Sequence, residues 1–367
     1  MNLTFFSRLI FAGILISCFA CSSKTMQENS AMADVGDVPP DKKVQVVEVP
    51  DQKRVNVLID GIPFTAYIYP DNVKKPILYP LRTSSGTPVT RGFPLEPREG
   101  ERVDHPHHVG FWFNYGDVNG LDFWNNSESI DPAKRDNYGT IVHREVVQTR
   151  SGDDQGELEV VMDWMAPDGE KLITEQTKFV FHAPDAYTRI IDRITKLTAQ
   201  EEILFKDNKE GMIGIRVARE LEHPSDDPIV FTDASGNPTD VPAMNNEGVT
   251  GVYHSSEGVE GEEVWGTRAR WMNLTGTVEE EDIALIIMDH PDNVGHPTYW
   301  HARGYGLFAA NPLGQEAMSG GKEQLNYTLP KGESVTFRHR LIIHSGEALS
   351  KDKIENIYTD FAENLGS

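Results

Sequence analysis

The chain has 367 residues, and its 57 Asp and Glu against 34 Lys and Arg give a formal net charge of -23. Because nucleic-acid binding requires clustered basic side chains, nucleic acid is not expected as a partner. Both cysteines lie near the N-terminus, so the rest of the chain is predicted to have no disulfide, no thiolate metal site and no catalytic cysteine.

The first residues have the pattern of an export signal. Arg8 precedes an apolar run over residues 9–16, which is too short to span a bilayer. The cysteine at Cys18 ends a stretch with the form of a bacterial lipobox, and Cys21 is a second candidate for lipidation. We therefore expect a signal peptide over residues 1–17 and an exported lipoprotein of the cell envelope, periplasmic or at the outer membrane, anchored to the membrane by lipid. The alternative is an ordinary cleaved signal.

Residues 18–50 are predicted to form a flexible tether because they are polar and acidic, with little periodic apolar content. The remaining segment, residues 51–367, is roughly 315 residues long, which is enough for one large core. No stretch of it approaches the ~20 apolar residues of a membrane helix. Since no repeat or boundary is visible, we predict a single domain.

Apolar residues with a period of two dominate this domain. Strands are predicted over residues 55–59 and 64–68, joined by a turn at Asp60 and Gly61. Further strands are predicted over residues 158–164, 187–195, 283–288 and 335–343. Ser350 is a predicted helix N-cap, because apolar residues then recur at spacings of three and four. The pattern favours an all-β fold, a large antiparallel β-sandwich with a short C-terminal helix.

The segment from Asp104 to Trp124 carries the densest chemistry of the chain. Its candidate acid/base residues are His105, His107, His108 and Asp117, and its candidate substrate-binding residues are Trp112, Asn119 and Trp124. Pro106 disfavours helical backbone at His105, so an extended segment is expected, with His105 and His107 on one side and His108 on the other. The histidines are predicted to be acid/base groups or metal ligands. The alternative is that they are structural and hydrogen-bonded around a turn.

A second cluster lies at residues 205–219. Asp207 and Glu210 occupy a charged turn before a strand predicted over residues 212–218, and both are candidate catalytic carboxylates. Arg216 lies inside the apolar run of that strand, where a guanidinium is costly to bury unless it meets a carboxylate or an anionic ligand. Arg216 is therefore predicted to bind substrate. The alternative is a surface turn with an internal salt bridge.

A third cluster lies at residues 288–303. Its acid/base candidates are His290, His296 and His301, and its substrate-binding candidates are Tyr299, Trp300 and Arg303. Two His-Pro pairs predict a loop leaving a strand, which is a usual place for site residues. Further along, Asn311 ends an apolar strand and is predicted to hydrogen-bond substrate hydroxyls, although a turn-initiating asparagine is the commoner explanation.

None of these clusters is a metal motif of fixed spacing. His-x-His with distant His and Asp could bind zinc, iron or copper, and histidine with carboxylate could equally transfer protons without metal. The chain has no phosphate-binding glycine loop, no Gly-x-Ser-x-Gly and no dinucleotide fingerprint. No cofactor is therefore specified, and a divalent metal stays an open candidate.

These clusters together resemble the bacterial PmoA-like family ("methane oxygenase PmoA", DUF6807), over nearly all of the mature domain. The matching segments are residues 90–102, 104–108, 116–124, 214–218, 268–271 and 289–312. Val109 departs from the family pattern, in which Arg is common. Methane oxidation is not expected, because the membrane methane monooxygenase subunit of similar name spans the bilayer several times and this domain has no span.

Residues 105–112, which read His-Pro-His-His-Val-Gly-Phe-Trp, are also similar to a His-Gly…Trp stretch of galactose mutarotase-like proteins. That similarity implies a β-supersandwich that binds sugars on its concave face, with histidine as acid and a carboxylate as base. We expect an extracytoplasmic carbohydrate-active enzyme, a hydrolase, lyase or epimerase, with a carbohydrate ligand. The alternatives are a metal-dependent enzyme with histidine ligands and a non-catalytic sugar-binding lipoprotein.

Overall fold

The computed structural model describes residues 42–225, 230, 233, 237–240 and 246–364, and within them strands dominate. The first antiparallel sheet has the spatial order β1 (Val44–Val49), β2 (Arg54–Ile59), β3 (Ile62–Ile68), β4 (Ile77–Leu78), β5 (Phe111–Tyr115), β11 (Gly211–Arg216), β16 (Leu307–Asn311) and β15 (Tyr299–Arg303). The second has the order β12 (Val252–Ser255), β13 (Trp271–Val278), β14 (Glu281–Asp289), β18 (Ser334–Ser345), β9 (Thr188–Ala199), β8 (Lys171–His182), β7 (Gln155–Met165) and β6 (Thr140–Arg150). A small third sheet pairs β10 (Ile203–Phe205) with β17 (Tyr327–Leu329). This arrangement confirms the predicted all-β fold with two large antiparallel sheets.

Helices are few and short among the described residues. They are η1 (Pro50–Gln52), η2 (Pro132–Asn137), η3 (Arg219–Leu221), η4 (Gly261–Val264), α1 (Gln315–Ser319) and α2 (Lys351–Asn364). The C-terminal helix α2 confirms the prediction, since the Ser350 hydroxyl accepts a hydrogen bond from the Lys353 backbone N–H at 3.3 Å. Its buried side chains Ile354 and Phe361 pack in a cluster with Trp271 of the second sheet. None of the described helices is long and apolar enough to cross a bilayer.

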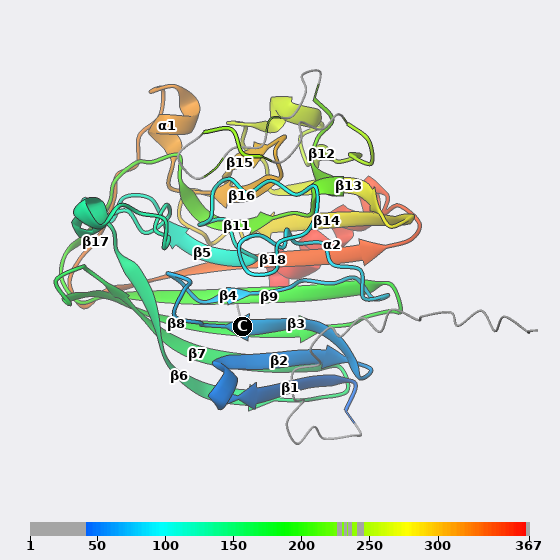
Figure 1. The fold of residues 1–367 in the computed structure, drawn as a ribbon, viewed down its shortest axis with the longest axis horizontal. Helices are drawn as coiled ribbons and strands as arrows, with labels where there is room; N and C mark the ends of the chain where they lie inside the picture. Colours follow the sequence, from blue (N-terminus) through cyan, green and yellow to red (C-terminus); the bar gives the residue numbers. More distant parts are fainter. Residues whose placement is uncertain (1–41, 226–229, 231–232, 234–236, 241–245, 365–367) are drawn as a thin grey trace, which may run out of the picture. The chain divides into compact units, whose positions relative to one another are not determined.

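The main core lies between the two large sheets (Figure 1). Phe113 of β5 contacts Trp164 of β7 and Phe337 of β18, with ring centroids 6.4 and 5.9 Å apart. Ile213 and Ile215 of β11 are buried in the same core. Because side chains alternate along a strand, the residues between these point to the opposite face of the first sheet, away from the second.

On that outer face of the first sheet, residues of four neighbouring strands lie side by side. In register across β5, β11, β16 and β15 lie Trp112, Gly214, Ala309 and His301, and one pair further along lie Arg216, Leu307 and Arg303. Paired residues share a face of the sheet. Segments far apart in the sequence therefore bring Arg216, His301 and Arg303 to one surface.

Gly214 leaves space on this face for the Trp112 indole. A Cβ at position 214 would lie 2.9 Å from Trp112 Cζ2, and the indole is itself packed against His108 and Trp124. Gly214→Ala is therefore expected to lower the free energy of unfolding by about 1–3 kcal/mol through overpacking. The thermal midpoint measures this, and an unchanged midpoint would show that the indole moves freely.

Candidate functional site

The histidine-rich segment before β5 folds as a turn around the buried guanidinium of Arg91. Arg91 Nη1 donates to the Asp104 carboxylate and to its backbone carbonyl, both at 2.9 Å. Arg91 Nη2 donates to the carbonyl oxygens of His105 and His108 at 2.9 and 3.0 Å. The His108 N–H also donates to the His105 carbonyl at 2.9 Å. One side chain from a distant segment thus sets the backbone of the turn.

The prediction of an extended segment at His105 was wrong. His105 has φ of 43°, in the left-handed region that non-glycine residues rarely adopt. The three histidine rings do not alternate, because the rings of His105 and His108 stack at 4.8 Å and those of His107 and His108 meet at 4.3 Å. The Arg91 hydrogen bonds to the surrounding carbonyl oxygens hold this strained backbone in place.

Asp104 is the charged centre of this turn. Its Oδ1 accepts hydrogen bonds from Arg91 and from Arg216, both at 2.9 Å, and its Oδ2 lies 3.0 Å from His105 Nδ1. Burial alone would raise the pKa of Asp104, but Arg216, His105 and Arg91 together hold that pKa well below its usual range. Asp104 is therefore ionised at neutral pH. The side chain of His105 is 40% exposed while its Nδ1 is buried, so the exposed edge of the ring points away from Asp104.

The tautomer of His108 follows from its contact with Arg216. Arg216 Nη1 lies 3.2 Å from His108 Nδ1, and because a guanidinium can only donate, His108 Nδ1 must accept. Burial, with the charges of His107 and Arg216, holds the pKa of His108 well below its usual value. His108 is thus neutral and carries its proton on Nε2, which is buried and has no hydrogen-bond partner among the described residues.

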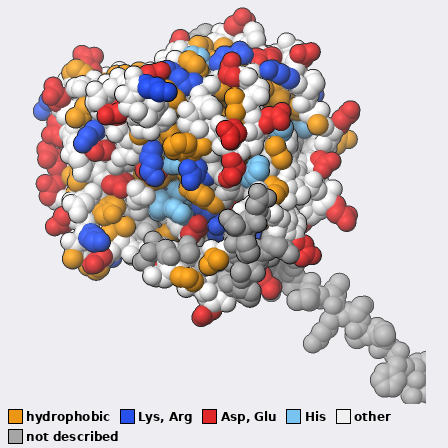
Figure 2. Space-filling view, turned by 90° about the horizontal axis from the view of Figure 1, so that it is seen from above, with side chains coloured by type: hydrophobic (Ala, Val, Ile, Leu, Met, Phe, Trp, Pro, Cys, Tyr) orange, Lys and Arg blue, Asp and Glu red, His pale blue; other side chains and the backbone are white. Residues whose placement is uncertain are grey.

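Aromatic rings and cations form a continuous row across the site, which we call the aromatic row. In order its members are Trp265, Arg303, Tyr305, His105, His108, Trp112 and Lys75, with successive separations of 5.5, 5.8, 5.3, 4.8, 5.4 and 5.4 Å. The rings of Tyr305, His105 and His108 are nearly parallel. Trp265, at the outer end, is 38% exposed, whereas Trp112, next to Lys75 at the inner end, is fully buried. Figure 2 shows histidine side chains beside basic and acidic ones on one face of the molecule.

A second histidine–carboxylate pair lies beside this row. His301 Nδ1 is 3.7 Å from Glu210 Oε2, and burial lowers the pKa of His301 to about 3, helped by the charges of Lys209, Arg303 and His105. Burial raises the pKa of Tyr305, and the negative charges of Glu210 and Asp104 add to that shift. The structure therefore brings together residues from all three predicted clusters.

The other two histidines of the third cluster are placed by β14 of the second sheet. His296 Nδ1 lies 2.8 Å from the buried carboxylate of Asp289, which also accepts from the Asn293 side chain and from the Thr298 N–H. His290 packs edge-on against Phe361 of α2 at 5.2 Å. These contacts connect both histidines to structural partners outside the aromatic row.

Three predicted polar residues are engaged in turns. Asp117 accepts from the Gly120 N–H at 2.9 Å, and Asn119 donates to Glu201 and to the Glu202 carbonyl. The Asp207 carboxylate accepts three backbone N–H groups, from Glu316, Leu325 and Asn326. These hydrogen bonds give Asp117, Asn119 and Asp207 structural partners.

The predicted aromatic and amide binding residues are mostly buried. Trp124 and Trp300 are fully buried like Trp112, so no indole of the three presents a face to solvent. Tyr299 lies under the Arg268 guanidinium at 5.0 Å. Asn311 donates to the carbonyl oxygens of Asn208 and Lys209, and thereby holds the turn that carries Glu210.

Five residues of this site were not predicted as site residues from the sequence: Lys75, Arg91, Asp104, Trp265 and Tyr305. Arg91 lies within the segment that resembles the family, whereas no sequence motif surrounds Trp265. Lys75 donates to the His107 carbonyl at 2.7 Å, and burial lowers the pKa of Lys75 to about 7, with Asp122 opposing the shift.

A family model described as "Family of unknown function (DUF6807)" matches residues 54–359. The chain belongs to this family. No curated protein matches it.

Solved structures similar to the DUF6807 chain share little sequence with it. The Slr1438 protein from Synechocystis sp. PCC 6803 has 8% identity over 83% of this chain and 96% of its own, with a TM-score of 0.30. Galactose 1-epimerase from Lactobacillus acidophilus NCFM has 8% identity over 83% and 100%, with a TM-score of 0.34. HI1317 has 10% identity over 83% and 100%, with a TM-score of 0.25. The residues of the candidate site are therefore interpreted from this chain alone.

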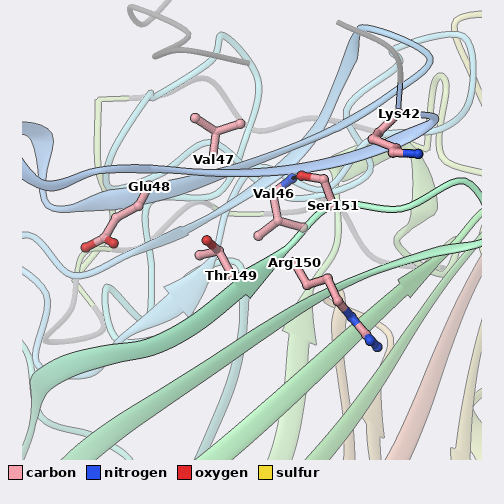
Figure 3. Close-up of a pocket in the computed structure, with 7 residues that line it drawn as sticks. All are labelled: Lys42, Val46, Val47, Glu48, Thr149, Arg150 and Ser151. Carbon is pink, nitrogen blue, oxygen red and sulfur yellow. Dashed lines mark hydrogen bonds between the residues drawn. The ribbon is translucent and has the colours of Figure 1, made fainter. Parts of the chain in front are cut away.

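The DUF6807 chain has two hollows that are separate from most of the aromatic row. The first contains no residue of the row, and the second contains only Lys75. An open groove of about 600 Å³ lies between β1 and β6. The side chains that line it, drawn in Figure 3, are Lys42, Val46, Val47, Glu48, Thr149, Arg150 and Ser151. Another, of about 360 Å³, is lined by residues that include Tyr69, Lys75 and His143. In the part of the chain that the structure describes, no three His, Cys, Asp or Glu side chains are arranged to hold a metal ion.

Proposed function

We propose that this DUF6807 protein is an enzyme that acts on a carbohydrate by proton transfer, with His105 as the exchanging group. The observation that carries this proposal is the Asp104–His105 pair. Asp104 is kept ionised by two buried guanidiniums and lies 3.0 Å from His105 Nδ1. A carboxylate 3.0 Å from one ring nitrogen leaves the opposite, exposed edge of the His105 ring to take or give a proton.

A second proton-transfer group is available across the aromatic row. Glu210 and His301 lie 3.7 Å apart, and Glu210 is partly exposed. The charges of both Glu210 and Asp104 act on Tyr305, whose ring stacks on that of His105 at 5.3 Å. Hydrolases, lyases and epimerases each need one acid and one base, and this arrangement supplies both without a cofactor.

A sugar is the substrate class that the rim of the site favours. Trp265 presents an exposed indole beside Arg303, which can donate to hydroxyl oxygens. A flat aromatic face next to hydrogen-bond donors suits a ring that has both C–H faces and hydroxyl edges.

We further propose that the protein is exported and lipid-anchored at Cys18 or Cys21. Both cysteines lie outside the described residues, so the proposal rests on the signal-like pattern of the first residues. An enzyme in the cell envelope would meet extracellular or periplasmic carbohydrate directly. Metabolic labelling with a radioactive fatty acid tests this, and replacement of both Cys18 and Cys21 by alanine is expected to abolish the label.

Turnover is tested by mass spectrometry of products across a panel of monosaccharides and oligosaccharides. At least one sugar is expected to give a new product in a time-dependent and enzyme-dependent way. Sugar binding without any product would instead support the non-catalytic sugar-binding lipoprotein. If no sugar either binds or reacts, the proposed function is wrong.

Trp265→Ala is expected to weaken sugar binding about 10-fold, because an exposed aromatic platform contributes on the order of 1–1.5 kcal/mol. Isothermal titration measures the change in Kd. The fold should be unaffected, since no other tryptophan is as exposed and Trp265 lies outside the main core. Unchanged Kd for every sugar that binds would remove Trp265 from the site.

A further inference from the structure

The cations of this site are not balanced by carboxylates, although the chain as a whole is strongly acidic. Arg91 and Arg216 share the single carboxylate of Asp104. Other nearby carboxylates have their own cations, since Glu222 pairs with Arg102 at 2.9 Å and Glu210 pairs with Lys209 at 3.1 Å. The centre of the site therefore has a surplus positive charge, which is costly in a buried position unless a ligand offsets it.

A second unbalanced cation lies at the rim. Among the described residues, no carboxylate lies within 4.0 Å of the Arg303 guanidinium, which is exposed and contacts the rings of Trp265 and Tyr305. Because β15 pairs with β16, and β16 with β11, Arg303 and Arg216 lie on the same face of the sheet. The exposed guanidinium of Arg303 and the surplus positive charge around Arg216 thus lie on the same face of the first sheet.

Buried donors around Asp104 also lack acceptors. Arg91 Nε, Arg216 Nε and His108 Nε2 are buried and have no hydrogen-bond partner in the described part of the chain. All three are donors, His108 because its Nδ1 accepts from Arg216. A site with surplus donors and surplus positive charge complements a ligand rich in acceptors and negative in charge.

From these observations we infer that the substrate is an anionic sugar, a uronate or an oligosaccharide that contains one, whose carboxylate binds Arg303. This inference rests on the proposed carbohydrate function and specifies its substrate class. A planar guanidinium matches a carboxylate by two parallel hydrogen bonds. A uronate carries one negative charge and a phosphate ester about -1.5 to -2. The Arg303 guanidinium at the rim, with the exposed carboxylate of Glu262 near Gly304, favours the ligand of smaller charge.

Binding is tested on the full chain by isothermal titration with matched pairs, galacturonate against galactose and glucuronate against glucose. The uronate of at least one pair is expected to bind about 10-fold more tightly than its neutral partner, as for a charge-assisted hydrogen bond. That preference should decrease as salt is raised, because Arg303 is exposed.

Two substitutions test whether the charge of Arg303 or only its shape matters. One removes a positive charge and the other removes a negative charge. Arg303→Gln is expected to remove the preference for the uronate, so that the two sugars of a pair then bind with Kd values within about 2-fold of each other. Glu262→Gln removes a nearby repelling carboxylate and is expected to strengthen uronate binding about 2-fold. Arg144→Gln is the matched control, because Arg144 is an exposed arginine on β6 of the second sheet, and no change is expected.

The outcomes distinguish this inference from the proposed function. Equal binding of uronates and neutral sugars overturns the anionic substrate and leaves a carbohydrate enzyme in place. Tighter binding of inorganic phosphate or a sugar phosphate than of either uronate overturns the carboxylate class. If no sugar of either kind binds or reacts, both the inference and the proposed function are overturned.

Discussion

His105→Asn is expected to reduce kcat/KM at least 100-fold on any sugar that the wild type converts, while the thermal midpoint stays nearly unchanged. Removal of a general acid or base costs about 10²–10⁴-fold in rate. Asparagine tolerates the left-handed backbone observed at position 105 and cannot exchange a proton at neutral pH. Steady-state kinetics and thermal unfolding of the same preparation measure the two effects.

The matched control is His254→Asn. His254 has a similar exposure, 37% against 40%, and its Nδ1 lies 3.3 Å from the carboxylate of Glu260. It lies on β12 of the second sheet and is outside the aromatic row. Its substitution is expected to leave kcat/KM within about 2-fold. Full activity in His105→Asn, or an equal loss in both variants, would contradict a catalytic role for His105.

The fold could be predicted because its signals are local. Alternating apolar residues mark the strands, and the turn at Asp60 and Gly61 has φ of 53° and 77°, as a tight hairpin requires. The spacing of Ile354 and Phe361 similarly predicts the buried face of α2. Each of these features depends on neighbours within a few residues, which a single sequence displays directly.

The site could be predicted only in part, because its geometry depends on contacts between distant segments. The backbone at His105 is left-handed because Arg91 binds the carbonyl oxygens around it. The preference of a residue before proline for extended backbone is a local effect, and it takes no account of that contact. The sequence could not separate His296 from His301. In the structure His301 lies on β15 of the first sheet, whereas His296 lies in the loop before it and contacts Asp289 of β14 in the second sheet. Trp265 was missed because exposure of an indole depends on tertiary packing.

Asp104→Asn is expected to be the most destabilising single substitution at this site, lowering the free energy of unfolding at neutral pH by about 3–5 kcal/mol. Asp104 is the only carboxylate that both Arg91 and Arg216 contact among the described residues. Both guanidiniums are almost fully buried, so the amide would leave two positive charges without a counter-charge. Chemical denaturation at constant temperature measures the change.

Asp163→Asn is the matched control, since Asp163 is equally buried but pairs with Arg144 and Lys171, which are exposed. Water screens those partners, so a loss of about 1 kcal/mol or less is expected.

The pKa of Asp104 is depressed in the folded protein, so its stabilising effect is complete above the ordinary Asp pKa near 4 and is lost on acidification. The difference between wild type and Asp104→Asn should therefore be largest at neutral pH and decrease below about pH 4. A difference that is small at neutral pH, or that grows on acidification, would mean that Asp104 does not hold the two arginines as an ionised carboxylate.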